Sequence, residues 1–415
     1  MVSVALLVCA CGSRARVESN EGASGGSGSA SGAAGQGSGA AAPKQCKMVD
    51  GKLSYGPIGQ PLPWPLEILS TSRDCASCRA VQDSFAFRTA AGYAIVWRNF
   101  DANSPTMNLF GMTVGPNFEG GEPRPIAAKN YTIHLDVASA ADAIVVTTCS
   151  LDSQPEWIFL NSKLEVAGAP RFAPQGASCK FYASPVVWTG QHYLTSFTDA
   201  RGLVVAALNK EGTPVGEQIV SEDVVEPVKA HFSRNGDRVL FGFKPEPVGP
   251  LRYGVLDLQG TPLGQIQPLG GEINGLSEFA IVTSRDGWLV VSDSGIGHET
   301  IGTLTAISRD GLTVQAKGKF DNLMLGAVKP SPYVGSLLVG SWLEEGMFAH
   351  TFALMTLLDD DHQSVYSTER DTSAKIGPWP FDVVADPLRD LVIEGRAHEE
   401  GYARPTVIQE YGCLD

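Results

Sequence analysis

Charged residues are scarce in this sequence, and basic residues never cluster. Lys, Arg, Asp and Glu make up 18% of the 415 residues, and the net charge is −14 at pH 7. Phosphate backbones and anionic lipid head groups attract basic patches, which an acidic chain of this kind does not offer. The composition therefore argues against nucleic acid as a partner and against electrostatic attachment of the folded domain to anionic lipid.

Long apolar runs and amphipathic helical stretches are also lacking. The apolar run 2–10 is too short to cross a bilayer, so we expect no transmembrane span in the mature chain. The chain instead holds 46 Gly and 26 Pro, which favour short strands joined by many turns. The composition predicts an all-β class in which helix is incidental.

Local catalytic motifs are missing as well. The sequence has no Gly-x-Ser-x-Gly elbow, no His-Glu-x-x-His pair and no glycine loop of the kind that cradles phosphate. An active site assembled from distant residues leaves no such motif. The absence therefore disfavours an enzyme without excluding one.

What the sequence does contain is a polar turn followed by a short apolar strand, repeated about every fifty residues. After each copy come a loop, a second strand, a polar turn such as 209–212, and a weaker outer strand. Strand-rich repeats of this period are typical of β-propellers, whose blades bury their faces only against their neighbours. The seven copies begin at Gly92, Asp142, Gly190, Asp237, Gly287, Gly335 and Arg389.

The two ends of the repeat region complement one another. The last copy ends with the strand 406–410, one strand short of a blade. The segment 50–59 has the turn and the Gly and Pro spacing of an outer strand, yet it follows no inner strands. We therefore predict a seven-bladed β-propeller closed by the N-terminal strand, because ring closure removes the exposed sheet edges of an open stack.

Three repeats resemble those of known propellers. The segments 233–241 (SRNGDRVLF) and 284–291 (SRDGWLVV) resemble the Ser-x-Asp-Gly repeats of TolB-like and related bacterial propellers. The segment 187–194 (VWTGQHYL) is similar to the Trp-x-Gly-x-x-Tyr repeats of secreted bacterial propellers. These likenesses lie in strand and turn residues, so they imply a fold and not a function.

The N-terminal segment resembles the signal of a bacterial lipoprotein. Its apolar run ends in VCAC, which is similar to a lipobox with Ala10 before the cleavage point and Cys11 as the lipidated residue. By this resemblance residues 1–10 are a signal peptide, and Gly12 in place of Asp favours the outer membrane. The alternative is a plain cleaved signal peptide and a periplasmic or secreted protein.

A flexible tether separates this signal from the repeats. Residues 11–44 are rich in Gly, Ser and Ala, which cannot bury enough apolar surface to offset the entropy of ordering them. The low-complexity part, 22–42, has a root-mean-square reach of about 25 Å. We therefore expect a signal peptide (1–10), a tether (11–44) and a propeller domain (45–415).

Six cysteines remain apart from Cys9 and Cys11, an even number that suits an exported, oxidising setting. Cys46 begins the segment that closes the ring, and Cys413 ends the strand beside it. We therefore pair these two across the seam.

The other four cysteines pair more locally in the propeller. Cys149 ends one strand and Cys179 opens the next blade on the same face, so we pair them. Cys75 and Cys78 are then left to form a disulfide with each other. A redox or zinc role for this Cys-x-x-Cys is the alternative, but it lacks the helix N-terminus or the second motif that such roles use.

Each expected loop between the second and third strands of a blade carries an acidic residue. One hypothesis is an acidic face that receives a cation, a basic peptide or a polyhydroxylated ligand, and the alternative is an ordinary solvated surface. No metal site or cofactor is predicted, although a divalent cation at this face stays open. The candidate residues are Asp101, Asp152, Asp199, Glu246, Asp293, Glu344 and Glu399.

The sequence favours a binding protein over an enzyme. We expect a cell-envelope lipoprotein that acts as a propeller scaffold for an envelope protein or a glycan. The alternative is a propeller hydrolase or lyase that acts on a glycan or a lactone at the acidic face. Carboxylates that converge at the channel mouth would favour the enzyme, whereas carboxylates spread around the rim would favour the scaffold.

Overall fold

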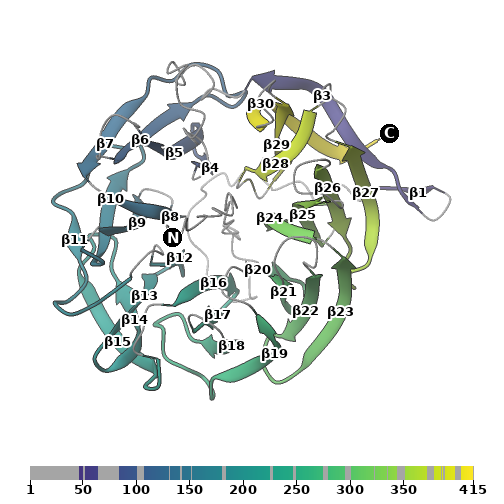
Figure 1. Ribbon diagram of the computed structural model, residues 1–415. Helices are drawn as coiled ribbons and strands as arrows, with labels where there is room; N and C mark the ends of the chain where they lie inside the picture. The colour runs from purple at the N-terminus through teal and green to yellow at the C-terminus, as the bar shows by residue number, and fades with distance from the viewer. Residues whose placement is uncertain are drawn as a thin grey trace, which may run out of the picture.

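Seven β-sheets surround a central axis in the computed structural model (Figure 1). Each has four antiparallel strands, which confirms the predicted seven-bladed β-propeller. Within the described part of the chain no helix is long and apolar enough to cross a membrane. The described residues are 46–49, 52–63, 84–100, 107–129, 131–140, 143–150, 152–179, 184–224, 228–245, 249–273, 279–294, 301–321, 323–333, 335–343, 351–371, 378–384, 386, 388–397 and 403–414.

The first four blades follow one another along the chain, each with its innermost strand first. Blade 1 consists of β4 (Ser84–Thr89), β5 (Gly92–Phe100), β6 (Met107–Val114) and β7 (Arg124–Lys129). Blade 2 consists of β8 (Tyr131–Ser139), β9 (Ala143–Ser150), β10 (Pro155–Asn161) and β11 (Arg171–Phe172). Blade 3 consists of β12 (Val186–Trp188), β13 (Tyr193–Asp199), β14 (Gly202–Leu208) and β15 (Pro214–Ser221). Blade 4 consists of β16 (Lys229–Asn235), β17 (Arg238–Lys244), β18 (Gly249–Leu256) and β19 (Gln267–Ile273).

The remaining three blades complete the ring. Blade 5 consists of β20 (Phe279–Ser284), β21 (Gly287–Ser294), β22 (Ile301–Ser308) and β23 (Val314–Asp321). Blade 6 consists of β24 (Leu323–Pro330), β25 (Ser336–Leu343), β26 (Thr351–Leu358) and β27 (Ser364–Asp371). Blade 7 consists of β28 (Pro378–Val383), β29 (Asp390–Ala397), β30 (Ala403–Cys413) and the N-terminal strand β3 (Tyr55–Pro63).

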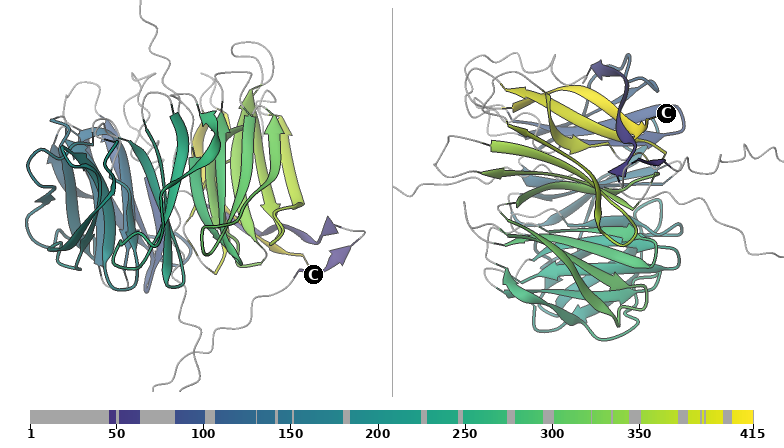
Figure 2. Two further views of the ribbon diagram at one scale, coloured as in Figure 1. Left: turned by 90° about the horizontal axis from the view of Figure 1, so that it is seen from below. Right: turned by 90° about the vertical axis from the view of Figure 1, so that its right-hand side faces the viewer.

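The ring has two distinct faces (Figure 2). We call the end that carries the connections from first to second and from third to fourth strands the turn face. The opposite end, with the connections from second to third strands and from blade to blade, is the loop face. Because strands alternate in direction within each blade, every β-turn of one kind emerges on the same face.

The N-terminal strand closes the ring, as predicted. β3 pairs with β30, with Tyr55 opposite Cys413, and the predicted disulfide between Cys46 and Cys413 joins the two segments at this point. The closing strand starts later than predicted, because residues before it first fold back as a hairpin of β1 (Met48–Val49) and β2 (Lys52–Leu53). This hairpin projects sideways from the outer edge of the ring, near its turn-face end (Figures 1 and 2).

The core is divided into seven apolar clusters. Each cluster joins the facing sheets of two neighbouring blades, for example Val96 of blade 1 with Val146 of blade 2. The last of them packs Leu337 of blade 6 against Val392 of blade 7. Alternate residues of each middle strand therefore serve different interfaces, which explains why these strands read as continuous apolar runs.

Six of the turns between third and fourth strands share one conformation. In each of these turns one residue adopts a left-handed backbone, and in blades 3, 4 and 5 this residue is glycine: Gly212, Gly260 and Gly311. A Cβ at Gly212 would lie 2.3 Å from the ring of Phe159, so glycine is required there. Blades 1, 2 and 6 have a large buried side chain at the same position of the turn: Phe118, Leu164 and His362.

A buried ion pair joins blades 6 and 7. Lys329 and Asp390 are both fully buried, with 2.9 Å between Lys329 Nζ and Asp390 Oδ1. Lys329 also donates hydrogen bonds to the carbonyls of Asp386 at 3.1 Å and Arg389 at 2.5 Å. The other oxygen of Asp390 accepts a hydrogen bond from the Tyr55 hydroxyl on the closing strand at 2.8 Å.

Asp386 extends this network to blade 1. Its Oδ2 accepts hydrogen bonds from the Tyr93 hydroxyl at 2.5 Å and from Arg88 Nη1 at 3.0 Å. Arg389 donates to the Tyr93 hydroxyl and to the carbonyl of Pro116, the latter at 3.2 Å. Burial and the hydrogen bond to Asp386 raise the pKa of Tyr93 to about 12. The seam network, as we call this set, thus spans three blades.

The seam network is expected to make stability depend on pH through Asp386. Burial alone would raise the pKa of Asp386, but hydrogen bonds from Tyr93, the Leu388 amide and Arg88 outweigh it and hold the pKa below its ordinary 3.8. A lowered folded-state pKa stabilises the protein above about pH 4 and ceases to do so as pH falls below that value. Urea unfolding of the wild type and of Asp386→Asn, measured from pH 3 to 7, tests this.

The difference in unfolding free energy between these two proteins should be constant from about pH 5 to 7 and should shrink below about pH 4. Glu211→Gln is the control, because Glu211 lies in an exposed turn of blade 3, outside the three blades of the seam network. A difference for Asp386→Asn that does not change with pH would contradict the assignment.

Candidate functional site

Two of the seven predicted acidic side chains lie among the described side chains of the loop face. Asp152 is exposed in the connection after β9, and Asp199 is the last residue of β13. Asp293 lies on strand β21 opposite Gly302 rather than in a loop, and its side chain is outside the described set. Asp101, Glu246, Glu344 and Glu399 lie outside the described residues.

Asp199 is engaged by a neighbouring arginine. Both of its oxygens accept hydrogen bonds from Arg201, with 2.6 Å between Arg201 Nη2 and Asp199 Oδ2. The same Nη2 reaches Glu217 Oε2 at 2.9 Å. The hydrogen bonds from Arg201 lower the pKa of Asp199, so this carboxylate is ionised and already neutralised. Asp199 therefore enters the acidic-face hypothesis as one half of an ion pair rather than as a free carboxylate.

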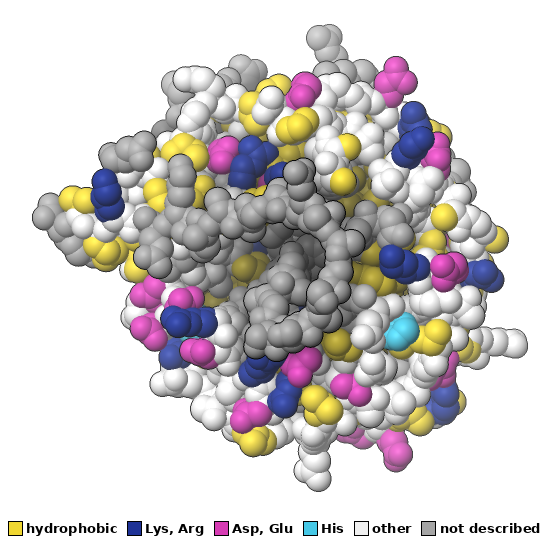
Figure 3. Space-filling model, turned by 180° about the vertical axis from the view of Figure 1, so that it is seen from behind, with side chains coloured by type: hydrophobic (Ala, Val, Ile, Leu, Met, Phe, Trp, Pro, Cys, Tyr) yellow, Lys and Arg dark blue, Asp and Glu magenta, His cyan; other side chains and the backbone are white. Residues whose placement is uncertain are grey.

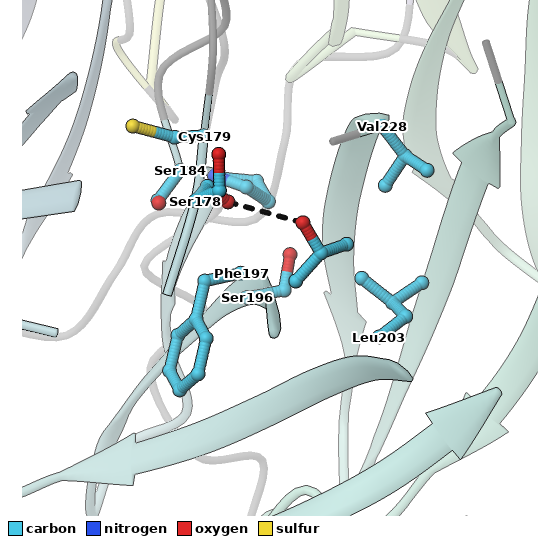
Figure 4. A pocket seen from close by; sticks show the side chains of 9 residues that line it. Ser178, Cys179, Ser184, Ser196, Phe197, Leu203 and Val228 are labelled. Atoms are coloured by element: carbon cyan, nitrogen blue, oxygen red, sulfur yellow. Dashed lines mark hydrogen bonds between the residues drawn. The ribbon is translucent and has the colours of Figure 1, made fainter. Parts of the chain in front are cut away.

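A small niche of mixed polar and apolar lining opens at the loop-face end of β13 (Figure 4). Hydroxyl side chains from three segments line it: Ser178 before the link to blade 3, Ser184 at the start of that blade, and Ser196 and Thr198 on β13. Thr198 Oγ1 donates a hydrogen bond to the Ser178 carbonyl at 3.2 Å. Ser184 Oγ is buried without a hydrogen-bond partner. The disulfide Cys149–Cys179 confirms the predicted pairing, and its Cys179 is one of the residues that line the niche.

The niche is sized for water rather than for a ligand. Its volume is about 10 Å³, which accommodates about one water molecule. A water there would satisfy the Ser184 hydroxyl, because hydroxyls both donate and accept hydrogen bonds. The lining holds no group that titrates near neutral pH, since Cys179 is in a disulfide. The niche can therefore anchor a polar contact but cannot perform acid–base chemistry by itself.

Sequence reasoning did not predict this niche. Its hydroxyls come from segments that are separated by up to twenty residues, and single Ser and Thr residues carry no spacing signal. The pairing of Cys149 with Cys179 was the one available hint, because it places the segment around residue 179 at the end of β9. The bridge between Ser178 and Thr198 is a separate contact that the sequence did not indicate.

No metal centre is formed by the described part of the chain, where no three His, Cys, Asp or Glu residues are grouped to hold an ion. The acidic run 359–361 with His362 lies in the turn between β26 and β27. Cys75 and Cys78 lie outside the described residues, so their pairing stays a prediction.

Comparison with known proteins finds solved structures of similar fold and does not identify a function. No protein-family model matches the sequence, and no curated protein matches it. The β-propeller domain of the Trilobed protease from Pyrococcus furiosus is similar in structure at 9% identity and a TM-score of 0.45, over 80% of this chain and 94% of that one. An oligogalacturonate lyase in complex with manganese is similar at 9% identity and a TM-score of 0.44, over 79% and 96%.

TolB from Acinetobacter baumannii is similar at 10% identity and a TM-score of 0.39, over 70% of this chain and 79% of that one. These likenesses concern the fold alone.

Proposed function

We propose that this chain is a cell-envelope lipoprotein whose propeller is a binding scaffold. The lipid anchor would be on Cys11, at the start of the tether 11–44, in the outer membrane. The support for an exported protein is the pair of disulfides, Cys46–Cys413 and Cys149–Cys179, since such bonds persist in oxidising compartments.

The observation that carries the scaffold proposal is the place where the tether joins the propeller. The tether ends at Cys46, which the disulfide to Cys413 holds on the turn face. The loop face lies at the opposite end of every blade (Figure 2). An anchored chain can therefore hold its turn face towards the membrane and present its loops to partners.

The partner surface in this proposal is the loop face, including the niche and the ion pair of Arg201 with Asp199. Arg201 is about half exposed while both of its acidic neighbours hold it in place, which makes it a preorganised donor for a polar partner. The exposed carboxylate of Asp152 would add contacts on the same face. An envelope protein or a glycan is the class of partner that such a polar, shallow surface fits.

We expect the full chain, expressed with its own leader in a Gram-negative host, to float with membranes and to incorporate an alkyne fatty acid. Cys11→Ser should abolish both, because the lipid is attached through that thiol. Crosslinking mass spectrometry of intact cells should then recover partners linked to loop-face residues near Arg201. The measured quantities are the membrane-bound fraction, the fatty-acid label and the crosslinked sites.

Cys9→Ser is the matched control, because it lies in the same apolar segment but is not the proposed lipidation residue. A label that survives Cys11→Ser would reject the anchor. Crosslinks confined to the turn face would reject the scaffold proposal. Turnover of a glycan or a lactone that is lost in Asp152→Asn or Asp293→Asn would establish the hydrolase or lyase alternative instead.

A further inference from the structure

The backbone of the closing strand β3 is weakly held in the ring. β3 lies at the outer edge of its sheet, so β30 alone pairs with it. Three of its nine residues, Pro57, Pro61 and Pro63, have no N–H to donate to the ladder. The pairing is also interrupted between Ile58 and Leu62, where the register shifts. A pull on this strand would therefore meet little resistance from its backbone.

A load on the tether enters the propeller just before this strand. The predicted tether, residues 11–44, leads to Cys46, and the hairpin of β1 and β2 is all that separates Cys46 from Tyr55. This hairpin projects from one edge of the turn face, on the left in Figure 3. Two-residue strands open easily. A pull that followed the backbone would therefore straighten the hairpin and then lift β3 from the ring, starting at Tyr55.

The disulfide Cys46–Cys413 offers this load a shorter covalent path. Cys413 ends β30, which lies inside the sheet between β29 and β3. β30 pairs with β29 along the whole of β29, from Asp390 to Ala397. A pull that reaches Cys413 is therefore resisted by a strand that is held on both edges. The path through the hairpin stays unloaded as long as Cys46 keeps its place beside Cys413.

Hydrogen bonds also tie the two ends of the domain together at this point. The Leu414 amide donates to the Ser54 carbonyl at 2.9 Å, and the Ser54 amide donates to the Lys47 carbonyl at 2.7 Å. The Tyr55 hydroxyl donates to Asp390 at 2.8 Å. These contacts hold the ends together at rest, but a sustained pull breaks non-covalent contacts one after another. Under load the disulfide is therefore the decisive connection.

We propose that the disulfide Cys46–Cys413 is a load-bearing clamp, which passes tension from the tether into β30 and so keeps the closing strand in the ring. The inference rests on the anchored tether of the proposed function for the source of the tension. The path of the tension depends only on the positions of the two cysteines. This role differs from ordinary stabilisation, because it acts only when force enters through the tether.

The test is single-molecule pulling with magnetic tweezers on the full chain carrying Cys11→Ser, so the result does not depend on lipid. One handle is attached in the tether at Gln36 and the other at Ala200, which is exposed on the loop face. The disulfide-bonded chain should show no early lengthening. Cys46→Ser with Cys413→Ser should first lengthen by at least about 60 Å, the extended length of residues 46–63.

Two controls separate the path of the load from overall stability. A handle on the C-terminus in place of the tether delivers the load to β30 in both proteins, so the early step should then be absent from both. Cys149→Ser with Cys179→Ser, pulled from the tether, should behave like the disulfide-bonded chain. That variant also loses a disulfide, but one that does not connect the tether to the ring.

Reduction during a pull keeps the test valid even if the seam variant does not close its ring. In the Cys149→Ser and Cys179→Ser background, the chain is folded with its seam disulfide intact and held at constant load through the tether. Dithiothreitol should then produce the same lengthening of at least about 60 Å.

An early step of this size in the disulfide-bonded chain would overturn the clamp, because the load would then remove β3 despite the bond. Its absence after removal or reduction of the seam disulfide would also overturn it, since β3 would hold by itself. An early step that appears equally with the C-terminal handle would assign the effect to overall stability and reject the clamp. None of these results bears on the lipid, whose presence on Cys11 is measured separately by the fatty-acid label.

Discussion

Replacing Cys46 and Cys413 with Ser is expected to lower the free energy of unfolding by about 6 kcal/mol. The disulfide joins residues 367 positions apart, so it restricts the unfolded chain over nearly the whole propeller. It also fixes the first pair of the closing strand, where Tyr55 lies opposite Cys413. Guanidinium unfolding followed by tryptophan fluorescence measures the loss.

Cys149→Ser with Cys179→Ser is the matched control. This disulfide spans 30 positions, and the same loop-entropy relation gives a smaller loss of about 3.5 kcal/mol. An equal or smaller loss in the seam variant than in this control would mean that strand pairing and the seam network alone hold the ring closed.

Lys329→Met is expected to destabilise the protein by about 3 to 5 kcal/mol, the usual loss when one partner of a buried ion pair is removed. The substitution keeps the length of the side chain but leaves the fully buried Asp390 carboxylate without its cation. It also leaves the carbonyls of Asp386 and Arg389 without their donor. Urea unfolding of wild type and variant gives the difference.

The double variant Lys329→Met with Asp390→Leu is expected to recover part of this loss, because it removes the uncompensated charge and fills the site with apolar groups. Recovery should be incomplete, since Tyr55 then loses its acceptor. A loss below about 1 kcal/mol for Lys329→Met would match a solvent-exposed ion pair and contradict the burial of this one.

The blade count and the closure could be predicted because both depend on local patterns that recur. Each predicted copy corresponds to the second strand of a blade, from β5 at Gly92 to β29 at Asp390. The disulfide Cys46–Cys413 followed from that closure, since an antiparallel partner for the last strand brings the two ends together. The hairpin of β1 and β2 was missed, because strands of two residues carry no readable periodicity.

The turn conformation could be predicted in part. Gly212, Gly260 and Gly311 signal a left-handed residue, but Phe118, Leu164 and His362 adopt the same conformation without such a signal. Their side chains are buried, so packing against neighbouring residues offsets the backbone strain. Local propensity alone does not reveal that compensation.

The candidate site was the least predictable part. Asp199 was predicted because each expected loop carries an acidic residue. The sequence did not show that Arg201 pairs with this carboxylate and with Glu217. The niche depends on Ser178, Ser184 and Thr198, which meet only after blade 3 has formed.

By itself the sequence determined the repeat, the all-β class, the number of blades and the closure of the ring by the N-terminal strand. These properties follow from the spacing of turns and apolar strands, which acts within about fifty residues of the chain. The tertiary structure alone decided that Lys329, Asp386, Asp390, Tyr55 and Tyr93 form one buried network. It also decided that Tyr55 of the closing strand packs against Tyr333 and Tyr366 of blade 6. Both features arise from residues up to several hundred positions apart, and only ring closure brings such residues to one seam or one face.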